Sequence, residues 1–197
     1  MRIDARAGEL AHLAARRLRE SAELKQALAK QAGTIARIAE VLVTAFRRGN
    51  KVMLFGNGGS AADAQHLAAE LMGRYRMKRK GLPAIALTTN TSNLTAISND
   101  YSFAEVFAMQ LIALGQSGDV AIGISTSGAS RNVVKALRVA RKKGLVTVGF
   151  TGAGGGTMKA LSDYCLSIPA KDTARIQESH ILAGHIICEI VEHEIFA

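Results

Sequence analysis

The sequence predicts a three-layer, doubly wound α/β fold with a five-stranded parallel sheet and an N-terminal helical extension. Five short apolar runs occur along the chain, and none shows the period-2 alternation of a half-exposed strand. Helical segments separate these runs, and Gly, Ser, Thr or Pro bounds each of them. Such strands are typical of a parallel sheet covered on both faces. The 197 residues suit one domain, 1–197, with helices in 1–48 and an α/β core in 49–197.

Two helices are expected before the first strand. Residues 5–29 carry apolar side chains at helical spacing among Arg and Glu, namely Leu10, Leu13, Leu18, Leu24 and Leu28. Residues 31–48 repeat the pattern with Ile35, Ile38, Leu42 and Phe46, and the pair Gly49–Asn50 ends the segment.

Strands and helices alternate in the remainder of the chain. The expected strands are Lys51–Phe55, Pro83–Thr88, Asp119–Ile124, Leu145–Phe150 and Tyr164–Ile168. The expected helices are Ser60–Tyr75, Phe103–Leu114, Arg131–Lys143 and Thr173–Phe196. The last helix is apolar nearly all round, and the N-terminal extension carries more apolar residues than one small sheet covers. Because such helices usually have more than one partner, we expect a homo-oligomer.

Composition excludes several classes of protein. With 48% hydrophobic and 21% charged residues, the chain is neither disordered nor fibrous. It shows no signal peptide and no apolar run long enough to span a membrane, and its two cysteines fit a reducing compartment. A cytoplasmic protein without a membrane partner is therefore expected. The net charge of +9 favours an anionic partner, but no aromatic residues interleave the basic groups, so nucleic acid is not expected.

Two loops at strand ends are candidate ligand sites, since parallel sheets bind ligands at the carboxyl ends of their strands. The first, Gly56–Ser60, is neither a Walker loop nor a dinucleotide fingerprint, and a tight strand-to-helix turn explains it equally well. The second, Ser125–Ser130, carries four hydroxyls before a helix. One serine suffices for an N-cap, so the surplus favours a phosphate cradle. A third loop, Thr151–Gly156, receives no role beyond a turn.

Four polar side chains on two helices are candidates for chemistry. His66 and Glu70 lie one turn apart on one helical face, although an exposed pair is an equally good interpretation. His185 lies in the most apolar helix, where a structural histidine is the commoner case, and Gln177 lies two turns earlier on nearly the same face. A metal or acid/base cluster is possible if the two helices meet.

These residues together resemble the sugar isomerase (SIS) domain family and, within it, the phosphoheptose isomerases. The resemblance covers essentially the whole chain. Its specific segments are GNGGSAADAQHLAAEL, LPAIALTT, ISND, GDVAIGISTSGAS and RIQESHILAGHIICEIVEH. It implies the SIS fold and a cytoplasmic homotetramer with active sites at subunit interfaces. It also implies conversion of D-sedoheptulose 7-phosphate to D-glycero-D-manno-heptose 7-phosphate. This is the first step toward nucleotide-activated heptose for lipopolysaccharide and other bacterial surface glycans.

The resemblance also assigns roles to residues. It implies that Glu70 and His185 are the catalytic acid/base pair. It implies one zinc ion per subunit, with the ligands His66, Glu70, Gln177 and His185. The substrate-binding residues it implies are Asn57, Gly58, Gly59, Glu70, Asn99, Asp100, Ser125, Thr126, Ser127, Ser130 and Gln177.

Two other functions share this fold and its loops. One is a non-enzymatic SIS protein that binds the bacterial replication initiator, and the other is a sugar-phosphate sensor. The non-enzymatic relatives lack the counterparts of Glu70 and His185, both of which are present here. An aldose–ketose isomerase moves a proton between neighbouring carbons through an enediol, which requires such a base and acid.

Overall fold

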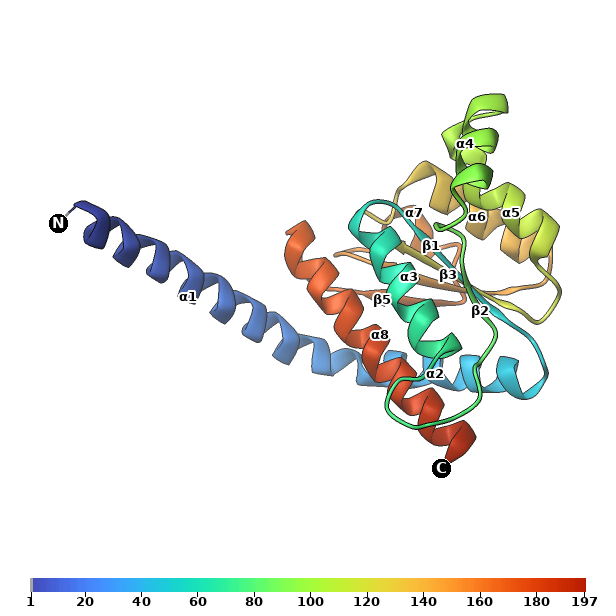
Figure 1. Cartoon of the computed structure of the whole chain (residues 1–197), viewed down its shortest axis with the longest axis horizontal. Helices are drawn as coiled ribbons and strands as arrows, with labels where there is room; N and C mark the ends of the chain where they lie inside the picture. Colours follow the sequence, from blue (N-terminus) through green and yellow to red (C-terminus); the bar gives the residue numbers. More distant parts are fainter. Residues whose placement is uncertain (1) are drawn as a thin grey trace.

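The computed structural model describes the backbone of residues 2–197 and the side chains of residues 6–197. It has three layers around one parallel sheet (Figure 1). Met1, which belongs to the predicted helical segment 1–48, lies outside the described residues. The strands are β1 (Val52–Gly56), β2 (Ala84–Ala86), β3 (Val120–Ser125), β4 (Val146–Thr151) and β5 (Tyr164–Ser167). They pair in the order β2-β1-β3-β4-β5, and every pair is parallel, which confirms the predicted fold class.

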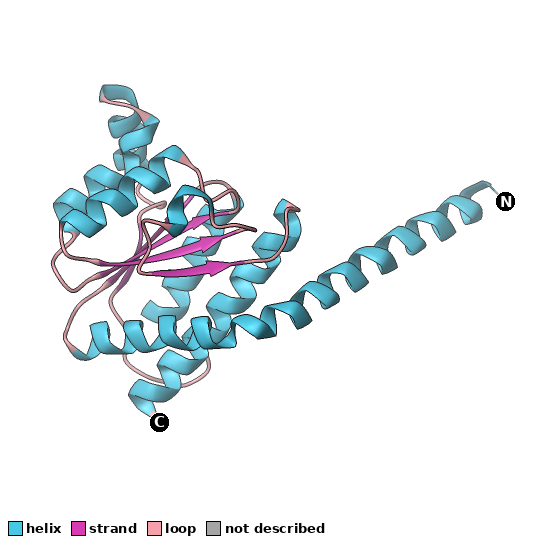
Figure 2. Ribbon diagram, turned by 180° about the vertical axis from the view of Figure 1, so that it is seen from behind, coloured by secondary structure: helices cyan, strands magenta, loops and turns pink. Residues whose placement is uncertain are grey.

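Helices cover both faces of the sheet (Figures 1 and 2). The α-helices are α1 (Arg2–Leu28), α2 (Ala32–Arg47), α3 (Gly59–Met72), α4 (Thr91–Asp100), α5 (Val106–Leu114), α6 (Arg131–Lys142), α7 (Gly156–Lys159) and α8 (Thr173–Phe196). Short 3-10 turns, Ala29–Gln31 and Phe103–Glu105, lead into α2 and α5. One core cluster joins the sheet to α2, α3 and α8, and the other joins it to α5, α6 and α7. The sheet is thus sandwiched between two hydrophobic layers, as its uniformly apolar strands predict.

Three elements differ from the expectation. Helix α4 was not predicted because TSNLTAISND is rich in residues of low helix propensity and none of its ten residues is buried. Its N-cap is Asn90, whose side chain accepts the amide of Asn93 at 3.0 Å. The four-residue helix α7 was missed inside a glycine-rich loop. Helix α3 ends at Met72 rather than Tyr75, because the chain leaves the helix at Gly73.

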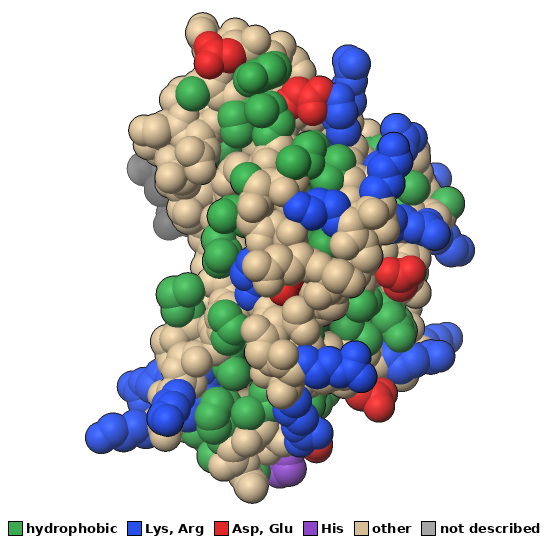
Figure 3. All heavy atoms as spheres, turned by 90° about the vertical axis from the view of Figure 1, so that its right-hand side faces the viewer, with side chains coloured by type: hydrophobic (Ala, Val, Ile, Leu, Met, Phe, Trp, Pro, Cys, Tyr) green, Lys and Arg blue, Asp and Glu red, His purple; other side chains and the backbone are tan. Residues whose placement is uncertain are grey.

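The basic residues lie in several groups on the surface. Figure 3 shows lysine and arginine side chains spread over one face of the molecule, with acidic and apolar side chains between them. Several basic groups of α6 and its end have local partners: Lys135 pairs with Glu105, and Arg141 donates to the carbonyl of Ala160 at 2.9 Å. These contacts indicate that part of the positive charge of the protein has a local structural role. Among the described residues, no helix is both long enough and apolar enough to cross a bilayer.

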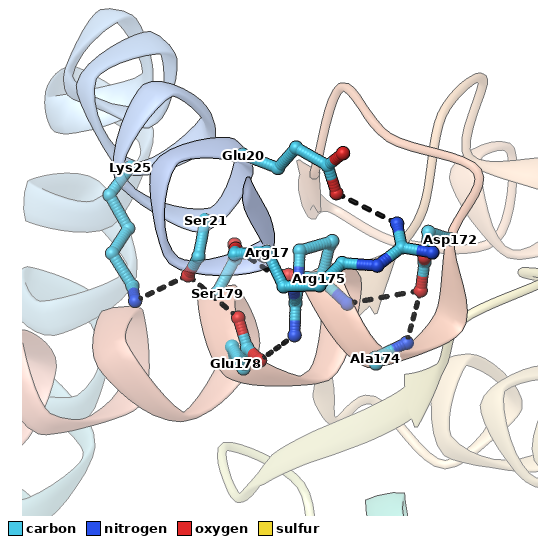
Figure 4. Close-up of polar contacts among 9 residues, drawn as sticks. All are labelled: Arg17, Glu20, Ser21, Lys25, Asp172, Ala174, Arg175, Glu178 and Ser179. Atoms are coloured by element: carbon cyan, nitrogen blue, oxygen red, sulfur yellow. Dashed lines mark hydrogen bonds and ion pairs between the residues drawn. The ribbon is translucent and has the colours of Figure 1, made fainter. Parts of the chain in front are cut away.

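Helix α1 projects from the body over much of its length (Figures 1 and 2). Its leucines Leu10, Leu13 and Leu18 are 57%, 43% and 71% exposed. Its C-terminal half is joined to the start of α8 by a polar cluster (Figure 4). There Ser21 donates to Glu178 at 2.8 Å, and the Arg175 guanidinium donates to the carbonyl of Arg17 at 3.1 Å.

Candidate active site

The sheet brings the predicted ligand loops together at one edge. The strand order reverses between β1 and β3, which are hydrogen-bonded neighbours. The loops after these strands therefore lie side by side at the topological switch point, where open α/β sheets bind their ligands. A cavity of about 520 Å³ lies here and is lined by Asn57, Ser102, Phe103, Ala104, Ser130, Arg131 and Asn132. Two of the predicted substrate residues, Asn57 and Ser130, thus border one cavity.

Backbone geometry sets the shape of the loop after β1. Gly58, the N-cap of α3, has φ +54° and ψ −122°, a conformation that favours glycine. Asn57 exchanges two side-chain hydrogen bonds with Asn132 of α6, at 2.9 and 2.8 Å. Asn132 is 3% exposed and was not singled out in the sequence, because a single asparagine in a helix carries no distinctive signal. It holds the Asn57 amide beside the cavity.

The serine loop after β3 has hydroxyls that bond to one another. The buried Ser125 Oγ lies 2.8 Å from Ser130 Oγ and 3.3 Å from Ser127 Oγ. Ser130 is the N-cap of α6, yet its side chain makes no capping hydrogen bond. The hydroxyls therefore exceed what capping uses. Beside them lies the N-terminus of α6, where Val133 N bonds to Asn132 Oδ1 and Val134 N to Ser130 O. A phosphate monoester is the ligand that this arrangement suits.

The third glycine-rich loop supports the serine loop, a role that the sequence did not reveal. Gly128 has φ +64°, and a Cβ built there would lie 2.2 Å from the carbonyl oxygen of Gly155. The amide of Met158 donates to the Gly128 carbonyl at 2.9 Å. The backbones of two loops thus pack directly against each other, which only glycine permits.

Helices α3 and α8 bring His66, Glu70 and His185 together. The Nε2 atoms of the two histidines are 2.9 Å apart, and His66 Nε2 is 3.2 Å from Glu70 Oε1. The helices approach closely because Gly184 has no side chain: a Cβ there would meet Leu67 Cδ2 at 2.5 Å. The ring of Tyr75 lies 5.7 Å from that of His185, centroid to centroid. Tyr75 is a neighbour of the cluster that the sequence did not single out, because its contact with His185 of α8 depends on the tertiary fold.

The cluster fits a metal ion such as zinc. Two imidazole nitrogens and one carboxylate oxygen lie within 4.8 Å of one another. Zn²⁺ binds nitrogen and oxygen ligands at about 2.0–2.2 Å, so tetrahedral ligands lie roughly 3.3 Å apart. The observed separations of 2.9 and 3.2 Å are close to that value.

Gln177 lies apart from this cluster within the same chain. A Cβ on Gly59 would lie 2.5 Å from its Nε2, so its amide lies at the start of α3 beside the ligand loop. Eight residues separate it from His185 along α8, a rise of about 12 Å. The structure thus brings together three of the four predicted metal ligands. It places Gln177 with Gly59, two predicted substrate-binding residues in contact.

Asn99 and Asp100 lie at the C-terminal end of the projecting helix α4 (Figure 1). Both are exposed, and Asn99 donates to the Asp100 carboxylate at 2.9 Å. No hydrogen bond joins their side chains to the predicted site residues in the described part of this chain. Their substrate role stays a prediction.

A further acidic residue of α3 lies one turn before His66. Burial raises the pKa of the Asp63 carboxyl to about 6, and His66 partly opposes that shift. Its buried Oδ2 has no hydrogen-bond partner among the described residues. No local sequence pattern singled out Asp63, because its burial follows from tertiary packing.

The chain belongs to the SIS domain family, whose model matches residues 18–152. It is 59% identical over 172 residues to the phosphoheptose isomerase of Roseiflexus sp. strain RS-1, covering 87% of each chain. It is 55% identical over 162 residues to the phosphoheptose isomerase of Aneurinibacillus thermoaerophilus, covering 82% of each.

Solved structures of phosphoheptose isomerases are also similar. That from Neisseria gonorrhoeae has a TM-score of 0.88 at 43% identity, covering 93% of this chain and 99% of that one. That from Francisella tularensis has a TM-score of 0.87 at 35% identity, covering 90% and 95%. The predicted family resemblance is confirmed.

Proposed function

We propose that this chain is an aldose–ketose isomerase that converts D-sedoheptulose 7-phosphate to D-glycero-D-manno-heptose 7-phosphate. The observation that carries the proposal is the contact of a carboxylate and two imidazoles across α3 and α8, on the same domain as a hydroxyl-rich loop at a helix N-terminus. The proposal is also supported by relatives that are named phosphoheptose isomerase and are 59% and 55% identical to this chain.

The phosphate of the substrate binds in the serine loop. The hydroxyls of Ser125, Ser127 and Ser130 already form one cluster, with Thr126 between them, and the N-terminus of α6 adds backbone N–H donors. Binding energy from this remote group holds the reacting carbons in place. Asn57 and the loop residues Gly58 and Gly59 contact the sugar, and Asn99 and Asp100 complete the proposed set.

Proton transfer is assigned to Glu70 and His185. Glu70 takes the proton from the carbon next to the carbonyl, and a sugar bound over the site shields this carboxylate from water. His185 donates a proton to the substrate oxygen that gains charge, which gives the enediol. Glu70 then returns a proton to the neighbouring carbon while the neutral His185 takes the proton of the hydroxyl on the first carbon, which yields the isomer.

His66, Glu70 and His185 are the residues of this chain that would hold a zinc ion, one per subunit. Bound there, zinc supplies Lewis-acid polarisation of substrate oxygens. Gln177 is the proposed fourth ligand. Because Gln177 of the same chain lies about 12 Å along α8 from His185, we assign this position to Gln177 of a neighbouring subunit.

A homotetramer with interfacial sites accounts for the exposed apolar surface. The α1 leucines Leu10, Leu13 and Leu18 and the α8 residue Ile186 are exposed in the described chain, and Ile186 borders an apolar cavity of about 410 Å³. Both surfaces are suited to contacts between copies. We place this enzyme in the cytoplasm, at the entry to nucleotide-activated heptose for lipopolysaccharide and related surface glycans.

The competing functions use the same fold. A protein that only binds the replication initiator, or a sensor that only binds a sugar phosphate, needs the serine loop but no acid/base pair. The packing of Glu70 and His185 into one cluster favours the enzyme.

The test is isomerase activity of purified Glu70→Gln and His185→Gln, with Glu40→Gln and His193→Gln as exposed controls on α2 and α8. Both site variants should lose at least ~100-fold in kcat, the scale of general acid–base catalysis, and still bind sedoheptulose 7-phosphate. Both controls should retain wild-type rates. Near-wild-type turnover in either site variant excludes the assigned roles, and an inactive wild type excludes the function.

A further inference from the structure

The loop between α3 and β2 is held against α8 by one buried carboxylate. Glu192 of α8 accepts the backbone N–H groups of Tyr75, Arg76 and Met77 at 3.0, 2.7 and 2.6 Å. It also accepts Nε of Arg79 at 2.8 Å, and the side chains of Glu192 and Arg79 are 3% and 2% exposed. Four donors on one carboxylate lower the pKa of Glu192 to about 2, so the group stays ionised.

The same arginine closes the C-terminal end of α3. Its Nη2 donates to the carbonyl of Glu70 at 2.8 Å, and its Nη1 donates to the carbonyls of Leu71 at 2.9 Å and Gly73 at 3.3 Å. These carbonyls are among those that a helix end leaves without intrahelical partners. The guanidinium fork therefore holds the last turn of the helix, which is the turn that carries Glu70.

The surroundings of both Glu70 and His185, the proposed acid/base pair, thus depend on one buried ion pair, Arg79–Glu192. Arg79 binds the backbone of Glu70 directly. Glu192 binds the amide of Tyr75, and the ring of Tyr75 lies 5.7 Å from the ring of His185. Glu192 itself is two turns beyond His185 on α8, so the ion pair joins the two catalytic helices just past the site.

We propose that Arg79 and Glu192 are positioning residues that set the placement of Glu70 against His185. The proposal rests on the proposed isomerase function. It differs from a purely stabilising role in one respect: a change of the pair should lower turnover by more than its effect on folding explains. A displacement of about 1 Å at reacting groups costs about 100-fold in rate.

The chain offers a control in the ion pair of Asp119 and Lys51, which joins the starts of β1 and β3. Asp119 is 1% exposed, and its carboxylate accepts the backbone amide of Lys51 at 3.0 Å, the Lys51 ammonium at 2.6 Å and the amide of Gln116 at 2.8 Å. It precedes β3, and its hydrogen-bond partners lie outside α3 and α8. Asp119→Asn therefore disrupts another ion pair of a buried carboxylate, one that makes no hydrogen bond to the helices that carry Glu70 and His185.

The experiment compares Glu192→Gln, Arg79→Lys and Asp119→Asn in the full-length protein. Rates are taken well below each unfolding temperature. Glu192→Gln should lower kcat by about 10- to 100-fold. KM should change less than about threefold, because the substitution leaves the serine loop, where the phosphate is proposed to bind, unchanged. Arg79→Lys keeps the charge but loses the fork, so it should lose several-fold in kcat, and Asp119→Asn should stay within twofold.

A kcat within threefold of wild type in both Glu192→Gln and Arg79→Lys would overturn the proposal. An equal loss in Asp119→Asn would also overturn it, because the effect would then follow stability alone. If Glu192→Gln does not fold, Arg79→Lys decides between these outcomes.

A second measurement does not depend on activity. Because the ring of Tyr75 lies 5.7 Å from that of His185, the imidazole proton resonances of His185 should carry a ring-current shift. These resonances should move in Glu192→Gln and not in Asp119→Asn. If the wild type fails to isomerise the sugar phosphate, the proposed function falls, and these resonances still decide whether the ion pair positions His185. Unchanged His185 resonances in Glu192→Gln would refute the positioning role.

Discussion

Replacement of Gly184 by alanine tests whether the close approach of α3 and α8 creates the site. An added Cβ would lie 2.5 Å from Leu67 Cδ2 and 2.6 Å from Cδ1. An ordinary contact begins near 3.4 Å, so the two groups must separate by about 1 Å. Leu67 is 4% exposed and has little room to rotate. The helices should therefore move apart, and with them His185 from His66 and Glu70.

Stability and activity should respond differently to Gly184→Ala. Alanine favours a helix over glycine by about 1 kcal/mol, while overpacking costs about 1–3 kcal/mol. The net loss is at most about 2 kcal/mol, which lowers Tm by at most about 4–8 °C for a chain of this size. A misplacement of about 1 Å lowers kcat by up to 100-fold. We expect a folded protein with turnover reduced 10- to 100-fold.

The assay is the rate of sedoheptulose 7-phosphate isomerisation together with thermal unfolding. Gly33→Ala in α2 is the control, since nothing lies within 4 Å of its built Cβ. It should raise stability by about 0.5–1 kcal/mol and leave activity unchanged. The pair Gly184→Ala with Leu67→Val should recover part of the rate. Wild-type kcat in Gly184→Ala would refute the reasoning, because the close approach would then have no effect on the site.

Three other predictions concern the phosphate, the metal and pH. Ser127→Ala should raise KM for the sugar phosphate about tenfold, since a hydrogen bond to a charged group contributes about 1.5–3 kcal/mol; an unchanged KM contradicts the phosphate cradle. Chelation should lower activity, and added Zn²⁺ should raise the unfolding temperature of the wild type but not of His66→Gln; equal shifts contradict the ligand role of His66. Burial lowers the pKa of His180 to about 4 from 6.5, while its Nε2 donates to the Thr151 carbonyl at 3.1 Å. The unfolded chain then binds the proton first, so this contribution to stability is complete above pH 6.5 and is lost toward pH 4, by up to about 1.4 kcal/mol per pH unit. Urea unfolding at pH 7 and 5.5 should show this loss in the wild type and less of it in His180→Gln, and equal pH dependence contradicts the assignment.

The sheet could be predicted from the sequence because its signals are local. Strands such as Val120–Ser125 are apolar up to their last residue, and the serine loop directly follows that strand. The helix Thr91–Asp100 gave no such signal, because it is exposed and poor in helix formers.

The site could be predicted only in part. Spacing placed His66 and Glu70 on one face, but the meeting of their helix with His185 depends on packing at Gly184 and Leu67, which no periodicity reveals. The separation of Gln177 from His185, by contrast, could be predicted, because eight residues of one helix span about 12 Å.

The support around the site could not be predicted. Glu192 accepts backbone amides from residues more than 110 positions earlier in the chain. In the sequence, Arg79 is one of several basic residues in a loop, and only the fold shows that it is buried. Contacts of this kind depend on the tertiary arrangement rather than on local pattern.

The most direct test of the central claim is the reaction run in D₂O and followed by NMR. Proton transfer through an enediol predicts conversion of sedoheptulose 7-phosphate to the aldose, with deuterium on the receiving carbon in those turnovers in which Glu70 exchanges its proton with solvent. Glu70→Gln should give neither product nor exchange at a measurable rate. Conversion or deuterium exchange at the wild-type rate by Glu70→Gln would contradict the assignment of Glu70 as the base.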